Sequence, residues 1–128
     1  MEHAGFCTIK NNTKGKLPRL PFVSMKNKIL GEDYEFGLTI LTSKKQKEIN
    51  FKHRGKNQTT NILSFPLSPT SGEITMDPIK VHHDAPLFDM SYSKFFKYLV
   101  IHGMLHLKGF EHSSTMEKEE KKYLKMFS

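Results

Sequence analysis

The sequence predicts an α+β domain in which a small mixed β-sheet of about four strands is packed by helices. Segments rich in β-branched and aromatic residues alternate with segments whose apolar residues recur at helical spacing, in the order β, α, β, α, β, β, α, α. The length of 128 residues and the apolar content of 37% suit one core, so we expect a single domain over residues 1–128.

The first half supplies two strands and two helices. Residues 6–11 alternate weakly between apolar and polar, which predicts a strand, and residues 18–30 predict a helix that Gly31 ends. Residues 34–42 are rich in β-branched and aromatic side chains and predict the next strand.

Residues 43–55 predict the second helix. Ser43 is a plausible N-cap, and Gly55 favours a helix end because glycine readily takes a left-handed conformation. Ile49 and Phe51 are the apolar side chains that we expect to face the core.

The second half adds two strands and two helices. Residues 59–67 predict a strand that Pro66 ends or confines to a sheet edge, and residues 72–78 predict a short strand. The pattern is ambiguous over 79–90. A wide apolar face predicts a nearly buried helix over 91–107, and a last amphipathic helix over 116–127 follows.

The excess of positive charge lies in one half of the chain. Of the 20 basic and 13 acidic residues, twelve basic and five acidic ones lie in 1–60, so all of the formal charge of +7 is there. A one-sided basic excess favours a polyanionic partner, nucleic acid first, although a general solubility charge explains it equally well.

Cys7 is the only cysteine, which excludes an intrachain disulfide and favours a reducing compartment. We see no signal peptide pattern and no apolar run of the ~20 residues that a membrane helix needs. A cytoplasmic protein without a membrane partner is therefore expected.

Three of the seven histidines lie in HGMLHLKGFEH, residues 102–112. His102 and His106 are one helical turn apart, so both rings project from one face. Gly109 can stop the helix and turn the chain so that His112 returns to the same point. This spacing predicts a metal site with three imidazole ligands.

Three neutral imidazoles leave a fourth tetrahedral position for water, which is typical of catalytic rather than structural zinc. The pKa of such a water falls toward ~7, which makes hydroxide available at neutral pH. Only an unusual set that includes Cys7 could close the site with protein atoms.

A metal at this site could serve either of two reactions, hydrolysis of peptides or hydrolysis of phosphodiesters. The spacing also matches metzincin metalloproteases, but their general base is a Glu directly after the first histidine, and this chain has Gly103 there. The basic excess favours a phosphodiester instead, whose transition state requires a cation near its oxygens. Arg54, one of two arginines, lies beside Lys52 and Lys56 in KHRGKN, although a solvated helix-end cation also explains it.

The segments RGKNQTTNILSFPL, GEI and IHGMLHLKGFEH together closely resemble the YbeY family of bacterial endoribonucleases, also described as rRNA maturation factors. The match runs from about Asn50 to the end of the chain, and the histidine pattern is close to HGxLHLxGxDH. Glu111 replaces the usual Asp, the segment after His112 is shortened to SST, and Tyr98 stands where relatives often carry a more polar residue.

The resemblance implies a zinc-dependent endoribonuclease that hydrolyses single-stranded RNA. Its implied context is maturation of small-subunit rRNA, ribosome quality control and the cytoplasm. The family's zinc ligands fall on His102, His106 and His112, and its functional arginine falls on Arg54. Lys52 and Lys56 are candidates to guide the RNA backbone. A non-catalytic ribosome assembly factor with a structural metal is the alternative.

Overall fold

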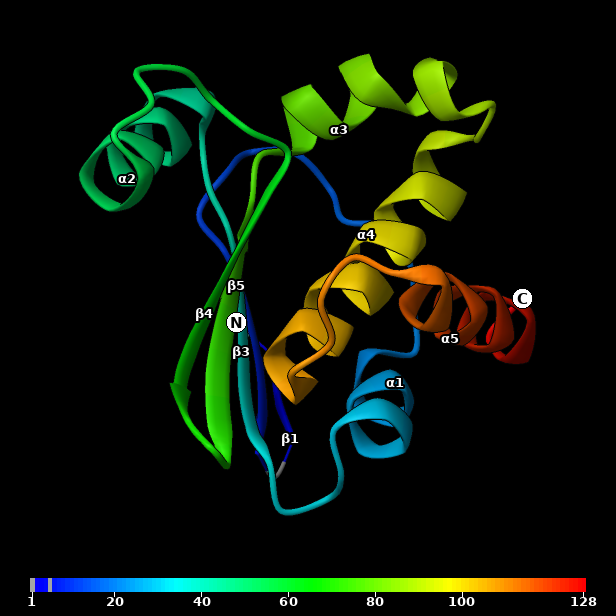
Figure 1. The fold of residues 1–128 in the computed structure, drawn as a ribbon. Helices are drawn as coiled ribbons and strands as arrows, with labels where there is room; N and C mark the ends of the chain where they lie inside the picture. The colour runs from blue at the N-terminus through cyan, green and yellow to red at the C-terminus, as the bar shows by residue number, and fades with distance from the viewer. Residues whose placement is uncertain (1, 5) are drawn as a thin grey trace.

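The computed structural model describes residues 2–4 and 6–128 and confirms the α+β prediction (Figure 1). The strands are β1 (Glu2–Ala4), β2 (Cys7–Asn11), β3 (Glu35–Ile40), β4 (Ile62–Ser68) and β5 (Ser71–Met76). The helices are α1 (Phe22–Ile29), α2 (Ser43–Arg54), α3 (Pro78–Asp84), the 3-10 helix η1 (Ala85–Phe88), α4 (Tyr92–Lys108) and α5 (Ser114–Met126).

The sheet is mixed, and within the described residues it has five strands in the order β1-β2-β3-β5-β4. Strands β2, β3 and β5 are parallel, whereas β1 and β4 run antiparallel to their neighbours at the two edges. Leu38 of β3 pairs with Ile9 on one side and Ile74 on the other. Pro66 lies in the edge strand β4, as predicted, because proline has no N–H to donate to a second neighbour.

The helices cover the two faces of the sheet unequally. In Figure 1, α1 and α4 lie on one side of the sheet, α5 packs outside α4, and α2 lies on the other side. The contacts agree, since Gly103 of α4 lies close to Ile62 and Ile74, while the ring of Phe65 meets His53 of α2 with ring centroids 5.0 Å apart. Neighbouring residues of β4 therefore face different helices.

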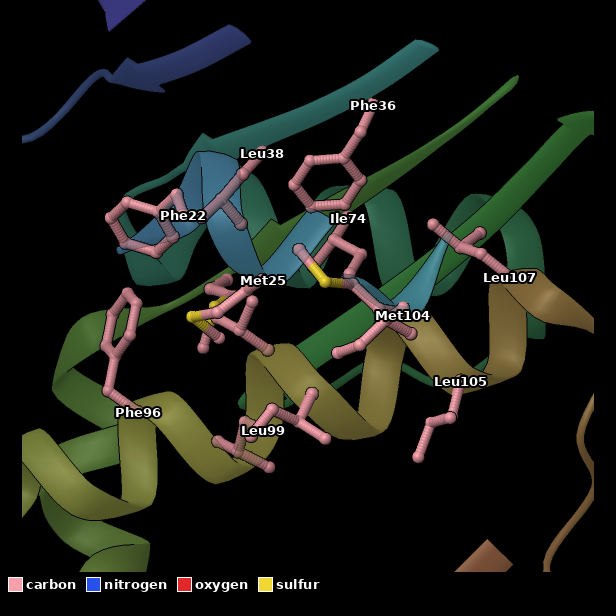
Figure 2. Close-up of a cluster of buried hydrophobic side chains, with 14 of the residues drawn as sticks. Phe22, Met25, Phe36, Leu38, Ile74, Phe96, Leu99, Met104, Leu105 and Leu107 are labelled. Atoms are coloured by element: carbon pink, nitrogen blue, oxygen red, sulfur yellow. The ribbon is translucent and has the colours of Figure 1, made fainter. Parts of the chain in front are cut away.

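The core lies between the sheet and the pair α1 and α4 (Figure 2). Leu38 and Ile74 project from the sheet, and Met25 and Met104 meet them from the two helices, each of them almost completely buried. Burial of one such side chain stabilises the fold by about 1.5–3 kcal/mol. Helix α4 is buried along most of its length, as the wide apolar face predicts, and is a rigid base for whatever it carries.

Two details of the predicted second helix are wrong. Thr42, not Ser43, is the N-cap of α2, and its hydroxyl accepts a hydrogen bond from the backbone N–H of Lys45. Phe51 does not face the core but is 56% exposed, because α2 buries the amides Gln46 and Asn50 instead.

The ambiguous segment 79–90 folds into α3 and η1, and β1 is an added strand that the sequence pattern does not predict. The predicted glycine helix ends are confirmed at Gly31, Gly55 and Gly109, which all have a positive φ. Among residues 2–4 and 6–128, no helix combines the length and the apolar content needed to cross a membrane.

Candidate metal centre

Two of the predicted ligands lie side by side on the last turns of α4. The Nε2 atoms of His102 and His106 are 3.1 Å apart, and their rings are nearly perpendicular, with centroids 4.5 Å apart. Both rings are half-buried. The separation of four residues therefore gathers two imidazole nitrogens on one helix face.

Gly109 brings the third histidine back, as the sequence predicts. At φ 110° it takes a conformation that side chains disfavour, and the N–H groups of Gly109 and Phe110 donate to carbonyls of His106 and Leu105. The reversed chain carries His112 over the α4 pair, with its ring centroid 5.1 Å from that of His102. One nitrogen of each of the three rings lies within 4.8 Å of the others.

The outer nitrogens of the α4 pair are held by acceptors. His106 Nδ1 faces the carbonyl oxygen of Phe110 at 3.0 Å, and His102 Nδ1 faces the carboxylate of Glu120 from α5. Because a carbonyl or carboxylate oxygen only accepts, both Nδ1 atoms carry the proton. When both rings are neutral, both Nε2 atoms present lone pairs toward the same point.

Two lone pairs that face each other repel unless a cation lies between them. The 3.1 Å between the Nε2 atoms is close to the about 3.3 Å that separates two nitrogen ligands of a tetrahedral zinc ion. Within the described part of the chain, the group that could hold an ion is His102, His106 and His112, without Cys7. The three histidines, called the histidine cluster below, therefore fit a divalent metal and leave a position open.

The protonation of the cluster favours a metal at neutral pH. Burial, together with the neighbouring His102, lowers the pKa of His106 below its usual value, so this ring is a neutral ligand. Burial and the adjacent carboxylate of Glu120 raise the pKa of Tyr98, whose hydroxyl stays protonated and hydrogen-bonds to Glu120. Tyr98 and His102 thus share the same buried carboxylate.

Gly103 lies against the sheet and not in the metal centre. A Cβ at this position would come within 2.5 Å of Ile74 Cδ1 and 3.0 Å of Ile62 Cδ1. The close approach at this glycine is therefore made by β4 and β5. A glutamate after His102 would point into the core, so this position cannot supply the general base of a metzincin.

Arg54 is not one of the residues gathered in the histidine cluster. It is the exposed last residue of α2 and borders a hollow of about 350 Å³, called the Arg54 hollow below. Its described lining contains none of the three histidines and consists of Asn50, Arg54, Lys56, Gln58, Thr59, Thr60, Asn61, Lys80 and Asp84. Lys56 joins Arg54 there, whereas Lys52 is exposed outside this lining.

The walls of the Arg54 hollow are fixed by hydrogen bonds from buried amides. Asn50 donates from its side chain to the carbonyl of Gln58 at 2.7 Å, and Gln46 donates to the carbonyls of Thr60 and Thr75. Asp84 accepts from Asn61 at 3.0 Å and pairs with Lys80 at 3.2 Å. Hydrogen bonds therefore hold the polar tract RGKNQTTN in place. Its backbone carbonyls accept from Gln46 and Asn50, which explains why α2 buries polar residues.

Glu120 is the residue of the metal centre that the sequence reading missed. A signal was present, because Met116, Glu120 and Tyr123 form the buried stripe of α5 and one of the three is acidic. A carboxylate on the apolar face of a helix needs a partner. His102 and Tyr98 are those partners.

Comparison with known proteins points to one family. A family model described as endoribonuclease YbeY matches residues 9–128. The endoribonuclease YbeY of Petrotoga mobilis is 32% identical over 100 residues, which cover 76% of this chain and 69% of that protein. The Thermotoga maritima protein of the same name is 33% identical over 100 residues, covering 72% of this chain and 67% of the relative.

A solved structure shares the fold. The solution structure of TM1509 from Thermotoga maritima superimposes with a TM-score of 0.66 at 27% sequence identity, and the match covers 93% of this chain and 87% of that one. The likeness extends across the sheet and helices and is not confined to the histidine segment.

Proposed function

Because this chain belongs to the YbeY family, we propose that it is a zinc-dependent endoribonuclease that hydrolyses phosphodiester bonds of single-stranded RNA. The observation that carries the proposal is the histidine cluster, in which two Nε2 lone pairs face one point 3.1 Å apart and a third ring closes over them. The Petrotoga mobilis and Thermotoga maritima relatives are described as endoribonucleases.

The chain's own residues have defined roles in this proposal. His102, His106 and His112 would hold the ion, which supplies Lewis-acid stabilisation of phosphate charge and a lowered pKa for a water ligand when bound. Glu120 and the carbonyl of Phe110 keep the first two rings in the tautomer that ligates. Exposed His112 leaves the outer side of the site open for substrate.

Arg54 is the proposed phosphate-binding residue. A guanidinium pairs with phosphate oxygens through two parallel hydrogen bonds and stabilises charge that develops on them. Lys56 borders the same hollow and adds a second cation, and the exposed Lys52 lies one half-turn before Arg54. These cations should make RNA binding weaken as salt rises.

The proposed cellular role is inferred from the resemblance to the YbeY family. We place the proposed activity in maturation of rRNA of the small ribosomal subunit and in ribosome quality control, in the cytoplasm. The basic first half, which holds the whole excess of +7, suits a ribosomal RNA partner.

The decisive experiment measures metal content and RNA cleavage on one preparation made without a histidine tag. Elemental analysis should find about one zinc per chain, and the protein should cut single-stranded RNA but not a peptide library. Chelation should stop cleavage, and zinc should restore it.

The alternatives give different results in the same assays. A structural metal in a non-catalytic assembly factor predicts that chelation unfolds the chain and that no preparation cleaves RNA. A metalloprotease predicts chelator-sensitive peptide cleavage. Either result would overturn the proposal.

A further inference from the structure

A second hollow lies at the opposite end of α4 from the histidine cluster. Its volume is about 450 Å³, and it opens beyond the carboxyl ends of the three parallel strands β2, β3 and β5. In Figure 1 this is the upper end of the sheet, where α3 and the first turn of α4 lie. We call it the strand-end hollow. Open α/β sheets commonly bind ligands beyond the carboxyl ends of parallel strands.

The interior of the hollow suits a flat ring. Leu17, Leu41 and Ile79 contribute apolar walls, and Ile79 is 69% exposed. The rings of His82 and Tyr92 also line it and stack on each other, with centroids 3.5 Å apart and planes 3° from parallel. His82 is exposed, so a further ring can extend this stack. A nucleobase stacks on such a surface whatever its sequence.

The rim of the hollow suits a phosphate. Lys14 and Lys16 flank Gly15 in the loop after β2, and both are exposed. Within residues 2–4 and 6–128, neither lysine forms an ion pair. Among the described lining residues, the one carboxylate is that of buried Asp77. It accepts from the backbone N–H groups of Ile79 and Lys80 and from the Thr59 hydroxyl.

From this pairing of a ring stack with unpaired cations, we infer that the strand-end hollow binds one nucleotide of single-stranded RNA, with the base against His82 and Tyr92 and the phosphate at Lys14 and Lys16. The inference deepens the proposed function and rests on it for the identity of the strand. Tyr92 lies ten residues before His102 on one helix, about 15 Å along its axis. The bound nucleotide therefore lies several positions from the bond that is cut.

The test measures equilibrium binding of a single-stranded oligouridylate to the full chain by fluorescence anisotropy, with and without metal. The K14A/K16A variant removes the phosphate contacts, and H82A removes the exposed ring without opening the core. The control K28A/K125A removes two exposed lysines of α1 and α5, so that the loss of charge is matched.

We expect K14A/K16A and H82A each to bind roughly tenfold more weakly than the parent. The slope of log affinity against log salt should fall in magnitude by about 1.4 for the lysine pair, because two contacts with a single strand are lost. Binding of both test variants at the level of K28A/K125A would overturn the inference.

Two further readouts identify the ligand and its position. RNA carrying 5-iodouridine should crosslink on irradiation to the peptides that contain His82 and Tyr92, and crosslinks confined to other peptides would overturn the inference. Uridine monophosphate should shift the amide resonances of Gly15 and Tyr92. Equal affinity for the mononucleotide and the strand would overturn the assignment to single-stranded RNA and would identify a free nucleotide as the ligand.

Failure of this inference is distinct from failure of the proposed function. If the parent cleaves RNA while K14A/K16A and H82A bind it like the control, the hollow is not an RNA site and the nuclease proposal stands. If the variants lose binding while the parent cleaves nothing, the hollow is an RNA site on a protein that is not a nuclease.

Discussion

The histidine cluster and the Arg54 hollow hold their side chains in different ways. His102 and His106 rise from a buried helix, and each outer nitrogen is fixed by an acceptor. Arg54 is the exposed last residue of α2, and in its hollow the hydrogen bonds hold the walls, through Asn50 and Asp84. The histidine cluster is organised before anything binds. In the Arg54 hollow the walls are held by hydrogen bonds, but the long side chain of Arg54 is exposed.

Because of this difference, we expect the histidine cluster to control affinity for an ion and Arg54 to act on an anionic substrate. A ligand set with fixed tautomers and spacing governs affinity for an ion, because little reorganisation is needed when the ion binds. An exposed guanidinium adds little to the stability of the fold. Its effect must appear when an anionic substrate is present. The comparison can be tested by changing one residue at a time and measuring metal affinity, RNA cleavage and stability separately.

The largest effect is expected from His106→Ala. Loss of one of three ligands should weaken zinc binding by more than the about 10–100-fold that follows from losing an outer-shell partner, and RNA cleavage should disappear. Competition with a chromophoric chelator measures the affinity. For zinc affinity, the control is His83→Ala, which removes an exposed histidine outside the cluster. Unchanged zinc affinity in His106→Ala would show that the cluster does not hold the ion.

Arg54→Ala should lower RNA cleavage by about 100-fold, the usual effect of losing one group that stabilises transition-state charge. Zinc affinity and the free energy of unfolding should stay at the parent values, since the side chain is exposed. Arg19→Ala, which removes the chain's other arginine, is the control. A drop in zinc affinity would show that Arg54 also supports the histidine cluster.

Glu120→Gln should weaken zinc binding by about tenfold, because a neutral amide orients the His102 ring less strongly than a carboxylate does. At saturating zinc, RNA cleavage by this variant should fall less than zinc affinity does, because Glu120 acts on the ligand and not on the substrate. Glu119→Gln is the matched control, since Glu119 pairs with Lys122 at 3.7 Å on the surface. Equal zinc affinities of the two variants would mean that Glu120 has no such role.

Asp84→Asn gives the smallest effect, and its sign depends on pH. Burial alone would raise the pKa of Asp84, but hydrogen bonds from His83, Lys80 and Asn61 outweigh it and lower the pKa. The lowered pKa in the folded state means that the carboxylate stabilises the protein above its unfolded pKa of about 3.9 and loses this effect as the pH falls further.

The variant should therefore be about 1 kcal/mol less stable than the parent at pH 7, and the difference should shrink as the pH approaches 3. Urea unfolding across this range measures it. Asp89→Asn, at an exposed position where φ is 53°, is the control because asparagine also tolerates that conformation. A difference between Asp84→Asn and the parent that does not vary with pH would contradict the assigned pKa.

Features that depend on short separations along the chain could be predicted from the sequence. Helix α4, the turn at Gly109 and the meeting of His102, His106 and His112 all follow from helical periodicity and one glycine. The edge position of Pro66 follows from its missing N–H. In each case, the residues that decide the structure lie within about three helical turns of one another.

Features that depend on partners far along the chain were missed. Glu120 meets His102 across eighteen residues, and Gln46 meets Thr75 across twenty-nine. Phe51 was expected in the core because it is apolar, but buried amides on α2 hold the loop that borders Arg54, and this turns Phe51 outward. The identity of such partners depends on the packed fold, which periodicity does not encode.

The carboxylate of Glu120 also joins α5 to the proposed metal centre. Release of α5 from α4 would free the His102 ring to rotate, so zinc would leave more readily whenever this helix detaches. Thermodynamic reciprocity requires that an ion bound by the cluster would in turn stabilise the attachment of α5 by the same free energy. Occupancy of the site and attachment of α5 would therefore be two coupled equilibria, each shifting the other.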